Sequence, residues 1–340
     1  MRRPRYPGRN PRAFHLKYKE LQPERYAADV QKVLESGKTP AGMHRPILVD
    51  EVLRVLAPQP GETAVDCTLG YGGHARALLA HLRPGGRLLG LDVDPIELPR
   101  TEARLRAAGF DGDVFSAHHA NFAGLEKVLA AEGVAGADVL LADLGVSSMQ
   151  LDDPDRGFTY KHAAPLDMRM NPARGEPATA ILERVSPSEL AEWLDAHGDE
   201  PFAGAIAERV AGQPLGTTRE LADLVRAAVR ESSPRTGAVA ADLSVRRAFQ
   251  AIRIAVNGEL SALDALLRAV PSCLAPGGRV ALLTFHSGED RRVKKAFQAG
   301  LLAGVFSEIS DEVIRPSSDE LRDNPLAAPA KLRWAVRRET

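Results

Sequence analysis

The chain has 340 residues, of which 44% are hydrophobic, and its formal net charge at pH 7 is −1. This length predicts two domains, or one large domain with an insertion. No stretch is long and apolar enough to span a membrane, and the Arg- and Pro-rich start lacks the apolar core of a secretory signal. The two cysteines exclude a disulfide scaffold, and no metal-ligand cluster is visible. We therefore expect a cytoplasmic protein without a metal site.

Residues 1–42 are expected to form a basic N-terminal arm, with a short helix near residues 24–36. The first part of the arm is rich in Arg and Lys and includes Tyr6, Phe14 and Tyr18. Cations neutralise phosphates and aromatic rings stack on bases, which favours a nucleic-acid contact. A solvated tail explains the same composition equally well.

After the arm, apolar strands alternate with helical runs. An amphipathic helix is expected over 46–56. Strands are expected at 63–68, 87–92, 113–117 and 137–142, separated by helices at 73–82, 95–108 and 122–132. Such alternation predicts βαβ units, a parallel sheet and right-handed crossovers.

The alternation then stops, and residues 148–246 are expected to be a mostly helical insertion. Capping sequences predict helix starts at Ser186 and Thr217. From residue 247 the earlier pattern resumes, with helices at 247–256 and 259–270, a strand at 279–285, a helix from 288 and a final strand at 332–337. Residues 43–147 and 247–340 would together form the sheet domain.

The most informative motif is the glycine loop after the first strand, Asp66-Cys67-Thr68-Leu69-Gly70-Tyr71-Gly72-Gly73-His74. It fits the dinucleotide fingerprint, so a nicotinamide-dependent oxidoreductase remains an alternative. Asp66 favours a ligand with a positive ammonium group, such as S-adenosyl-L-methionine, over one with a pyrophosphate. Asp92, at the end of the second strand, is suited to accept hydrogen bonds from a ribose.

Two further strand ends carry polar side chains. Asp143 ends the fourth strand and is followed by Ser147, and ligands in open α/β sheets bind beyond such ends. His286 follows the fifth strand, and we expect Ser287 to cap the next helix with Asp290. That helix is basic, which suits either a solvated face or a phosphate contact.

A polar stripe is expected on a helix further upstream. Gln250, Arg253 and Asn257 lie beside an apolar stripe and are candidates to contact a ligand or the insertion.

The ordered set of motifs resembles the bacterial MraW/RsmH family. The resemblance covers residues 43–340 and rests on the glycine loop together with His44-Arg-Pro-Ile-Leu-Val-Asp-Glu, Asp143-Leu-Gly-Val-Ser-Ser, Leu151-Asp-Asp-Pro-Asp-Arg-Gly-Phe, Pro165-Leu-Asp-Met-Arg-Met, Phe249-Gln-Ala-Ile-Arg-Ile and Phe285-His-Ser. It implies a class I S-adenosylmethionine-dependent methyltransferase, α/β and Rossmann-like, with a mostly parallel sheet, an antiparallel last strand and an inserted helical domain for substrate recognition. The implied reaction is methyl transfer from S-adenosyl-L-methionine to N4 of a cytidine in the decoding region of 16S rRNA. The partner would be that RNA within the 30S subunit, with no membrane involved, and a homodimer is compatible with the sequence.

By the same resemblance, cofactor-binding residues fall on matching positions of this chain. With those argued above, the expected cofactor set is Asp66, Gly70, Gly72, Gly73, His74, Asp92, Phe122, Asp143 and Gln150. The expected catalytic set is Asp143, Ser147 and His286. Asp143 would orient the amine and His286 would accept its proton.

The chain departs from the family pattern in three places. Gly288 stands where the family has leucine, and Leu243-Ser-Val-Arg replaces a His-Pro-Ala segment. Asn324-Pro-Leu-Ala-Ala lacks two arginines of an RNA-facing tail. Apart from these departures, a non-catalytic RNA-binding protein with the same fold is a second alternative.

Overall fold

The computed structural model describes residues 46–161, 163–235 and 237–339. The chain divides into two compact units. Unit 1 runs to Gly145 and resumes at Leu263, and unit 2 comprises Val146–Ala262. The predicted N-terminal arm and its helix lie outside the described residues. Within the described residues, no helix combines the length and the apolar character needed to cross a membrane.

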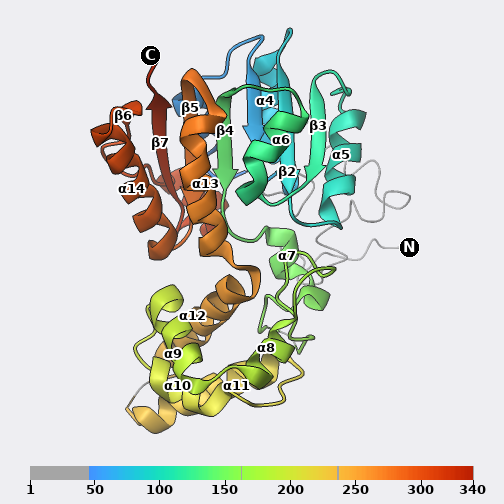
Figure 1. Cartoon of the computed structure of the whole chain (residues 1–340). Coiled ribbons are helices and arrows are strands. Elements are labelled where there is room, and N and C mark those ends of the chain that lie inside the picture. The colour runs from blue at the N-terminus through green and yellow to red at the C-terminus, as the bar shows by residue number, and fades with distance from the viewer. Residues whose placement is uncertain (1–45, 162, 236, 340) are drawn as a thin grey trace. The chain divides into compact units, whose positions relative to one another are not determined.

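Unit 1 is built on one sheet. Among the described residues its strands are β1 (Thr63–Asp66), β2 (Arg87–Asp92), β3 (Phe115–His119), β4 (Ala137–Asp143), β5 (Leu274–Thr284), β6 (Phe306–Ile309) and β7 (Lys331–Arg337). Their order is β3–β2–β1–β4–β5–β7–β6, which Figure 1 shows from edge to edge. The pairs among β1 to β5 are parallel, and β7 is antiparallel to both β5 and β6. The predicted mostly parallel sheet with an antiparallel last strand is confirmed.

Helices cover both faces of this sheet. They are α3 (Val49–Leu56), α4 (Gly73–Leu82), α5 (Glu97–Ala107), η2 (Phe122–Gly124), α6 (Leu125–Ala131), α13 (Glu259–Cys273), α14 (Ser287–Leu302), α15 (Ser318–Asp323) and η4 (Pro325–Ala327). Apolar side chains of α3, α4 and α5 form one buried cluster with β2, β4, β5 and β7. In Figure 1, α6 and α13 lie in front of the sheet, on the other face. The strands are apolar on both sides because both faces are covered.

The strand order positions the site. Strand β1 lies between β2 and β4, so the strands β1 to β3 are added toward one edge of the sheet and β4 and β5 toward the other. Asp66 ends β1, and Asp143 ends the neighbouring β4. Ligands of open α/β sheets bind at this kind of switch point, beyond the carboxyl ends of the strands. The two aspartates therefore belong to the region where a ligand is expected.

Unit 2 is helical, with α7 (Ser148–Asp152), η3 (Pro154–Arg156), α8 (Ala178–Arg184), α9 (Pro187–Gly198), α10 (Ala203–Val210), α11 (Thr218–Ser232) and α12 (Ala238–Asn257). Its core is a separate cluster that includes Leu194, Val225 and Phe249. Two predicted helix starts are confirmed. Ser186 caps α9, and Thr217 forms a full capping box with Glu220 at the start of α11.

Several element bounds differ from the expectation. Helix α12 begins nine residues earlier than the expected 247 and belongs entirely to unit 2, because Val245, Phe249 and Ile252 pack in that unit's core. The chain therefore returns to unit 1 at residue 263 rather than 247. Strand β5 starts at Leu274 instead of 279, and β6 was not expected. The four residues of β6 are too few to give a clear alternating pattern.

Candidate active site

The glycine loop is held by Asp92 at the end of β2. Asp92 Oδ2 accepts a hydrogen bond of 2.7 Å from the backbone N–H of Gly70, and Oδ1 accepts one of 2.8 Å from the N–H of Asp94. A carboxylate offers about four lone-pair positions, so both oxygens keep capacity for further donors. Burial raises the pKa of Asp92 and the backbone bonds oppose that rise. The arrangement suits the predicted ribose contact, since the acceptors are already fixed in direction.

Glycine is required at two positions of the loop for different reasons. Gly72 has φ +82°, and a Cβ there would lie 2.8 Å from Thr101 Cγ2. A Cβ on Gly73 would lie 2.4 Å from Pro46 Cγ. Gly72 precedes α4, and no side chain caps that helix within the described residues. The first N–H groups of α4 are therefore directed outward, which suits a ligand that approaches the backbone closely.

A cluster of titratable groups lies at the ends of β1 and β4. Asp66 is buried with 1% exposure, and its Oδ1 accepts the N–H of Thr68 at 3.1 Å. His74 Nε2 lies 3.0 Å from the carbonyl oxygen of Ile47, and its Nδ1 lies 3.6 Å from Asp143 Oδ2. Burial lowers the pKa of His74, so the neutral ring donates from Nε2 and presents the Nδ1 lone pair to Asp143. Burial also raises the pKa of Asp66 to about 6, despite the opposing effect of His74.

Asp143 has the most unusual environment in this cluster. Its Oδ1 is buried and makes no hydrogen bond within the described part of the chain. Desolvation, followed by the negative charge of Glu289, raises the pKa of this carboxyl to about 7. Its backbone N–H donates to Thr68 Oγ1 at 2.6 Å, which fixes the strand end. A buried acceptor without a partner usually has a functional reason, and perturbed carboxyls concentrate at functional sites.

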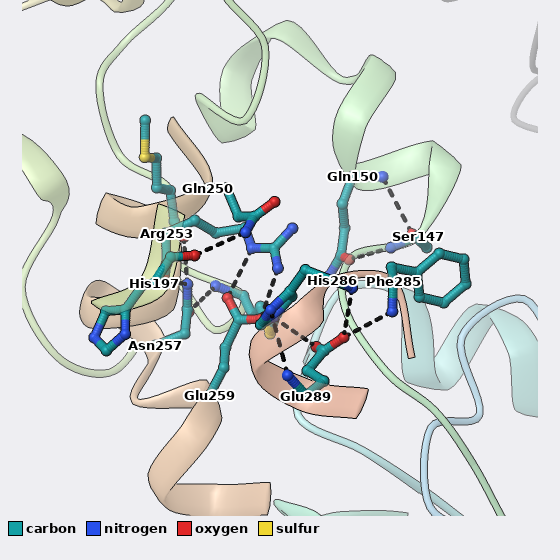
Figure 2. Close-up of polar contacts among 12 residues, drawn as sticks. Ser147, Gln150, His197, Gln250, Arg253, Asn257, Glu259, Phe285, His286 and Glu289 are labelled. Carbon is teal, nitrogen blue, oxygen red and sulfur yellow. Dashed lines mark hydrogen bonds and ion pairs between the residues drawn. The ribbon is translucent and has the colours of Figure 1, made fainter. Parts of the chain in front are cut away.

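His286 is bound to Glu289, as Figure 2 shows. Its Nδ1 accepts the N–H of Glu289 at 3.4 Å, and its Nε2 lies 3.2 Å from Glu289 Oε1. Glu289 Oε2 in turn accepts the N–H of Phe285 at 2.8 Å. His286 is thus the N-cap of α14, and the expectation that Ser287 caps this helix is wrong. The helix starts one residue earlier than expected, and a histidine ring nitrogen replaces the hydroxyl as the acceptor.

Ser147 and Gln150 form a reciprocal pair in unit 2, which Figure 2 also shows. Ser147 Oγ accepts the N–H of Gln150 at 3.2 Å, and Gln150 Oε1 accepts the N–H of Ser147 at 2.9 Å. The pair caps α7. In unit 1, Phe122 begins η2 after β3 and is half-buried. The functional roles expected for these three residues stay predictions.

The polar stripe of α12 contacts unit 2 itself (Figure 2). Gln250 Nε2 donates to the carbonyl of His197 at 2.8 Å, and Arg253 pairs with Glu259 at 2.8 Å. Asn257 Oδ1 accepts the N–H of Met170 at 2.7 Å. Of the two partners that the sequence allowed, a ligand or the insertion, these contacts are with the insertion.

Sequence reasoning missed three residues of the site. Thr68 fixes the end of β4, Glu289 holds His286, and Thr101 of α5 donates to the carbonyl of Gly70 at 2.5 Å. Thr68 lies inside the glycine-loop motif, so its place in the sequence could have marked it as a site residue. Thr101 lies 31 residues from its partner, and no local pattern reveals such a contact.

These residues fit a cofactor with a ribose and a cationic end. The fixed carboxylate of Asp92, the glycine loop and the acidic pair Asp66 and Asp143 supply the matching groups. The strand order with an antiparallel β7, together with this loop, defines a class I methyltransferase that depends on S-adenosyl-L-methionine.

The chain belongs to the MraW methylase family, whose model matches residues 41–338. It is 46% identical to "Ribosomal RNA small subunit methyltransferase H 1" of Lachnoclostridium phytofermentans, over 99% of this chain and 93% of that protein. It is 45% identical to "Ribosomal RNA small subunit methyltransferase H 2" of Alkaliphilus metalliredigens, over 99% and 97% of the two chains. Among solved structures, an rRNA methylase from Streptococcus thermophilus matches with a TM-score of 0.38 at 11% identity, covering 85% of this chain and 93% of that one. The family assignment rests on the sequence relatives and not on that structural match.

Proposed function

We propose that this chain transfers a methyl group from S-adenosyl-L-methionine to the exocyclic N4 of a cytidine in the decoding region of 16S rRNA. The names of the relatives support small-subunit rRNA as the substrate. The observation that carries the proposal is Asp143, which ends β4 with a buried carboxylate oxygen that has no partner in the described residues. An N–H of the target amine is a donor of the kind that would satisfy this oxygen.

The cofactor supplies an electrophilic methyl group on a positively charged sulfur. We assign the ribose to Asp92, because both of its oxygens are already fixed by backbone donors. The backbone of Gly70, Gly72 and Gly73 would lie against the cofactor, with His74 behind it. Asp66 would face the cationic end. Phe122 would stack on the adenine, and Gln150 belongs to the same proposed set.

The amine of cytosine is a weak nucleophile because its lone pair is delocalised into the ring. Asp143 would accept a hydrogen bond from this amine and hold it in line with the methyl group. As the N–C bond forms and the S–C bond breaks, the nitrogen gains positive charge, which a nearby carboxylate stabilises. The amine must then lose a proton.

A carboxyl with a pKa near 7 is suited to take up that proton at neutral pH. In the proposal Asp143 therefore accepts it first, and the Glu289–His286 pair receives it next. Glu289 is close enough to Asp143 to raise its pKa, so the two carboxyls are electrostatically coupled. Ser147, four residues after Asp143 in the chain, is the proposed second contact to the amine.

RNA as the partner is supported by the exposed face of α14. Arg291, Lys294 and Lys295 are exposed at helical spacing, and no ion pair holds them within the described residues. Such a stripe suits phosphates. The target base must leave its stack to be methylated, and we assign the recognition of the surrounding RNA to unit 2. The 30S subunit is the proposed context.

The test is transfer of labelled methyl groups from S-adenosyl-L-methionine to 30S subunits from cells that lack this enzyme. Label in 16S rRNA is expected. Calorimetry with S-adenosyl-L-methionine and with NADH runs alongside. Binding of NADH in place of S-adenosyl-L-methionine would favour the oxidoreductase alternative. RNA binding without binding of either cofactor would favour the non-catalytic alternative.

A further inference from the structure

Helix α5 contacts three consecutive residues of the glycine loop through Thr101 and Arg104, which we call the α5 clamp. Thr101 is fully buried, and its Oγ1 donates to the carbonyl of Gly70 at 2.5 Å. Arg104 donates to Thr101 Oγ1 at 2.5 Å. The Arg104 guanidinium lies over the Tyr71 ring, with Cζ 3.6 Å from the ring centroid. The same Thr101 places its methyl group against Gly72.

The contacts fix the backbone around Gly70 from both sides. Asp92 accepts the N–H of Gly70, and Thr101 donates to the carbonyl of the same residue. The N–H belongs to the peptide plane before Gly70 and the carbonyl to the plane after it. Holding both planes fixes both backbone dihedral angles of Gly70, whose φ is +48°. Glycine is otherwise the most mobile residue, so these bonds remove freedom that cofactor binding would have to remove.

Arg104 contacts both Thr101 and the glycine loop. Its charge-assisted bond orients the hydroxyl of Thr101, and its planar group packs on Tyr71. Glu97 lies 3.9 Å from Arg104 and is mostly buried, which holds the arginine on the helix. A residue of the same helix therefore helps to orient the guanidinium toward the glycine loop.

We propose that the α5 clamp is a positioning device that sets the glycine loop in its cofactor-binding conformation before S-adenosyl-L-methionine arrives. Thr101 and Arg104 act through Gly70 and Tyr71 and do not touch the reacting atoms. This inference rests on the proposed assignment of the loop to the cofactor. Preorganisation of this kind improves affinity by reducing the ordering that binding requires.

The test compares Thr101→Val and Arg104→Gln with the control Arg106→Gln. Valine keeps the shape of threonine and removes the donor, and Arg106 is an exposed arginine of the same helix, paired with Glu102. Calorimetry should show that both clamp variants raise the Kd for S-adenosyl-L-methionine about tenfold, the usual order for a lost buried hydrogen bond. The control should stay within about twofold of wild type. At saturating cofactor, kcat should be unchanged while KM for the cofactor rises.

Hydrogen exchange of the apo protein provides a readout without cofactor or turnover. The amides of residues 70–73 should exchange faster in both clamp variants and at the wild-type rate in Arg106→Gln. The inference is overturned if Kd and loop exchange match wild type, or if only the thermal stability changes. If wild type itself does not bind S-adenosyl-L-methionine, the proposed function fails instead. Arg104→Gln alters a partly exposed side chain, so it keeps the test valid if Thr101→Val folds poorly.

Discussion

Replacing Gly72 with alanine tests how tightly the glycine loop is packed. At φ +82°, a residue with a Cβ pays about 1–2 kcal/mol for the left-handed conformation. The new Cβ would also lie 2.8 Å from Thr101 Cγ2 and 3.4 Å from Leu105 Cδ1. Overpacking of a filled interior costs about 1–3 kcal/mol more. We expect Gly72→Ala to lower the free energy of unfolding by about 2–5 kcal/mol in total.

A second glycine separates the backbone cost from the packing cost. Gly109 has φ +85°, and nothing lies within 4 Å of a Cβ placed there. Gly109→Ala should therefore lose only the backbone part, about 1–2 kcal/mol. The difference between the two variants measures the overlap with Thr101.

Changing Thr101 to serine should relieve that overlap. Serine lacks the methyl group that meets the new Cβ but keeps the hydroxyl that donates to Gly70. The double variant Gly72→Ala/Thr101→Ser should recover about 1–3 kcal/mol relative to additivity. It should also bind S-adenosyl-L-methionine more tightly than Gly72→Ala alone.

Urea denaturation of the apo proteins measures these free energies, and calorimetry measures the affinities. The reasoning is refuted if Gly72→Ala costs no more than Gly109→Ala, or if Thr101→Ser adds its own cost without any recovery. Either result would mean that the loop adapts freely and that its shape is not set by α5.

Three further predictions concern the charged groups. Asp92→Asn should raise the Kd for S-adenosyl-L-methionine about tenfold or more in calorimetry, because bonds to the charged oxygens weaken. The pKa of Asp143 is raised from 3.8 to about 7, so the native state keeps a proton that the unfolded chain loses in that range. Stability in urea should therefore fall as pH rises from about 4 to about 7, and Asp143→Asn should remove that part of the fall. Replacing Arg291, Lys294 and Lys295 together with glutamine should reduce the slope of log affinity for RNA against log salt by about two.

Each of these predictions has its own contradicting result. An unchanged Kd in Asp92→Asn would remove the ribose assignment, with Glu102→Gln, at a half-buried position of α5 where it pairs with Arg106, as the control. An Asp143→Asn variant with the pH profile of wild type would show that the pKa of this carboxyl is not raised in the native state. For the salt slope, Lys127→Gln on α6 is the control. A slope that is equal in the triple variant and in this control would exclude α14 from the RNA contact.

The sequence predicted the sheet domain because its signals are local. Apolar strands, glycine turns and helix caps such as Thr217 with Glu220 lie within a few residues of each other. The strand ends with Asp66, Asp92 and Asp143 followed from the same pattern. Their meeting at one edge of the sheet follows from parallel pairing of adjacent strands.

Other features depend on which side chains are buried, or on contacts between distant residues. The N-cap of α14 was assigned to Ser287, because serine is the commoner cap, whereas the buried Glu289 selects His286. Helix α12 reaches further back than expected because its apolar face packs in unit 2, which no short window reveals. The hydrogen bond from Thr101 to Gly70 spans 31 residues. Neither the sequence of α5 nor that of the glycine loop gives any sign of it.

The proposed product is N4-methylcytidine in 16S rRNA. The direct measurement is mass spectrometry of nucleosides from 30S subunits of cells that lack this enzyme, after incubation with the purified protein and deuterated S-adenosyl-L-methionine. We expect deuterated N4-methylcytidine with wild type and a large loss of it with Asp143→Asn at saturating cofactor. Label on C5 of cytidine or on another nucleoside, or full N4 methylation by Asp143→Asn, would contradict the proposal.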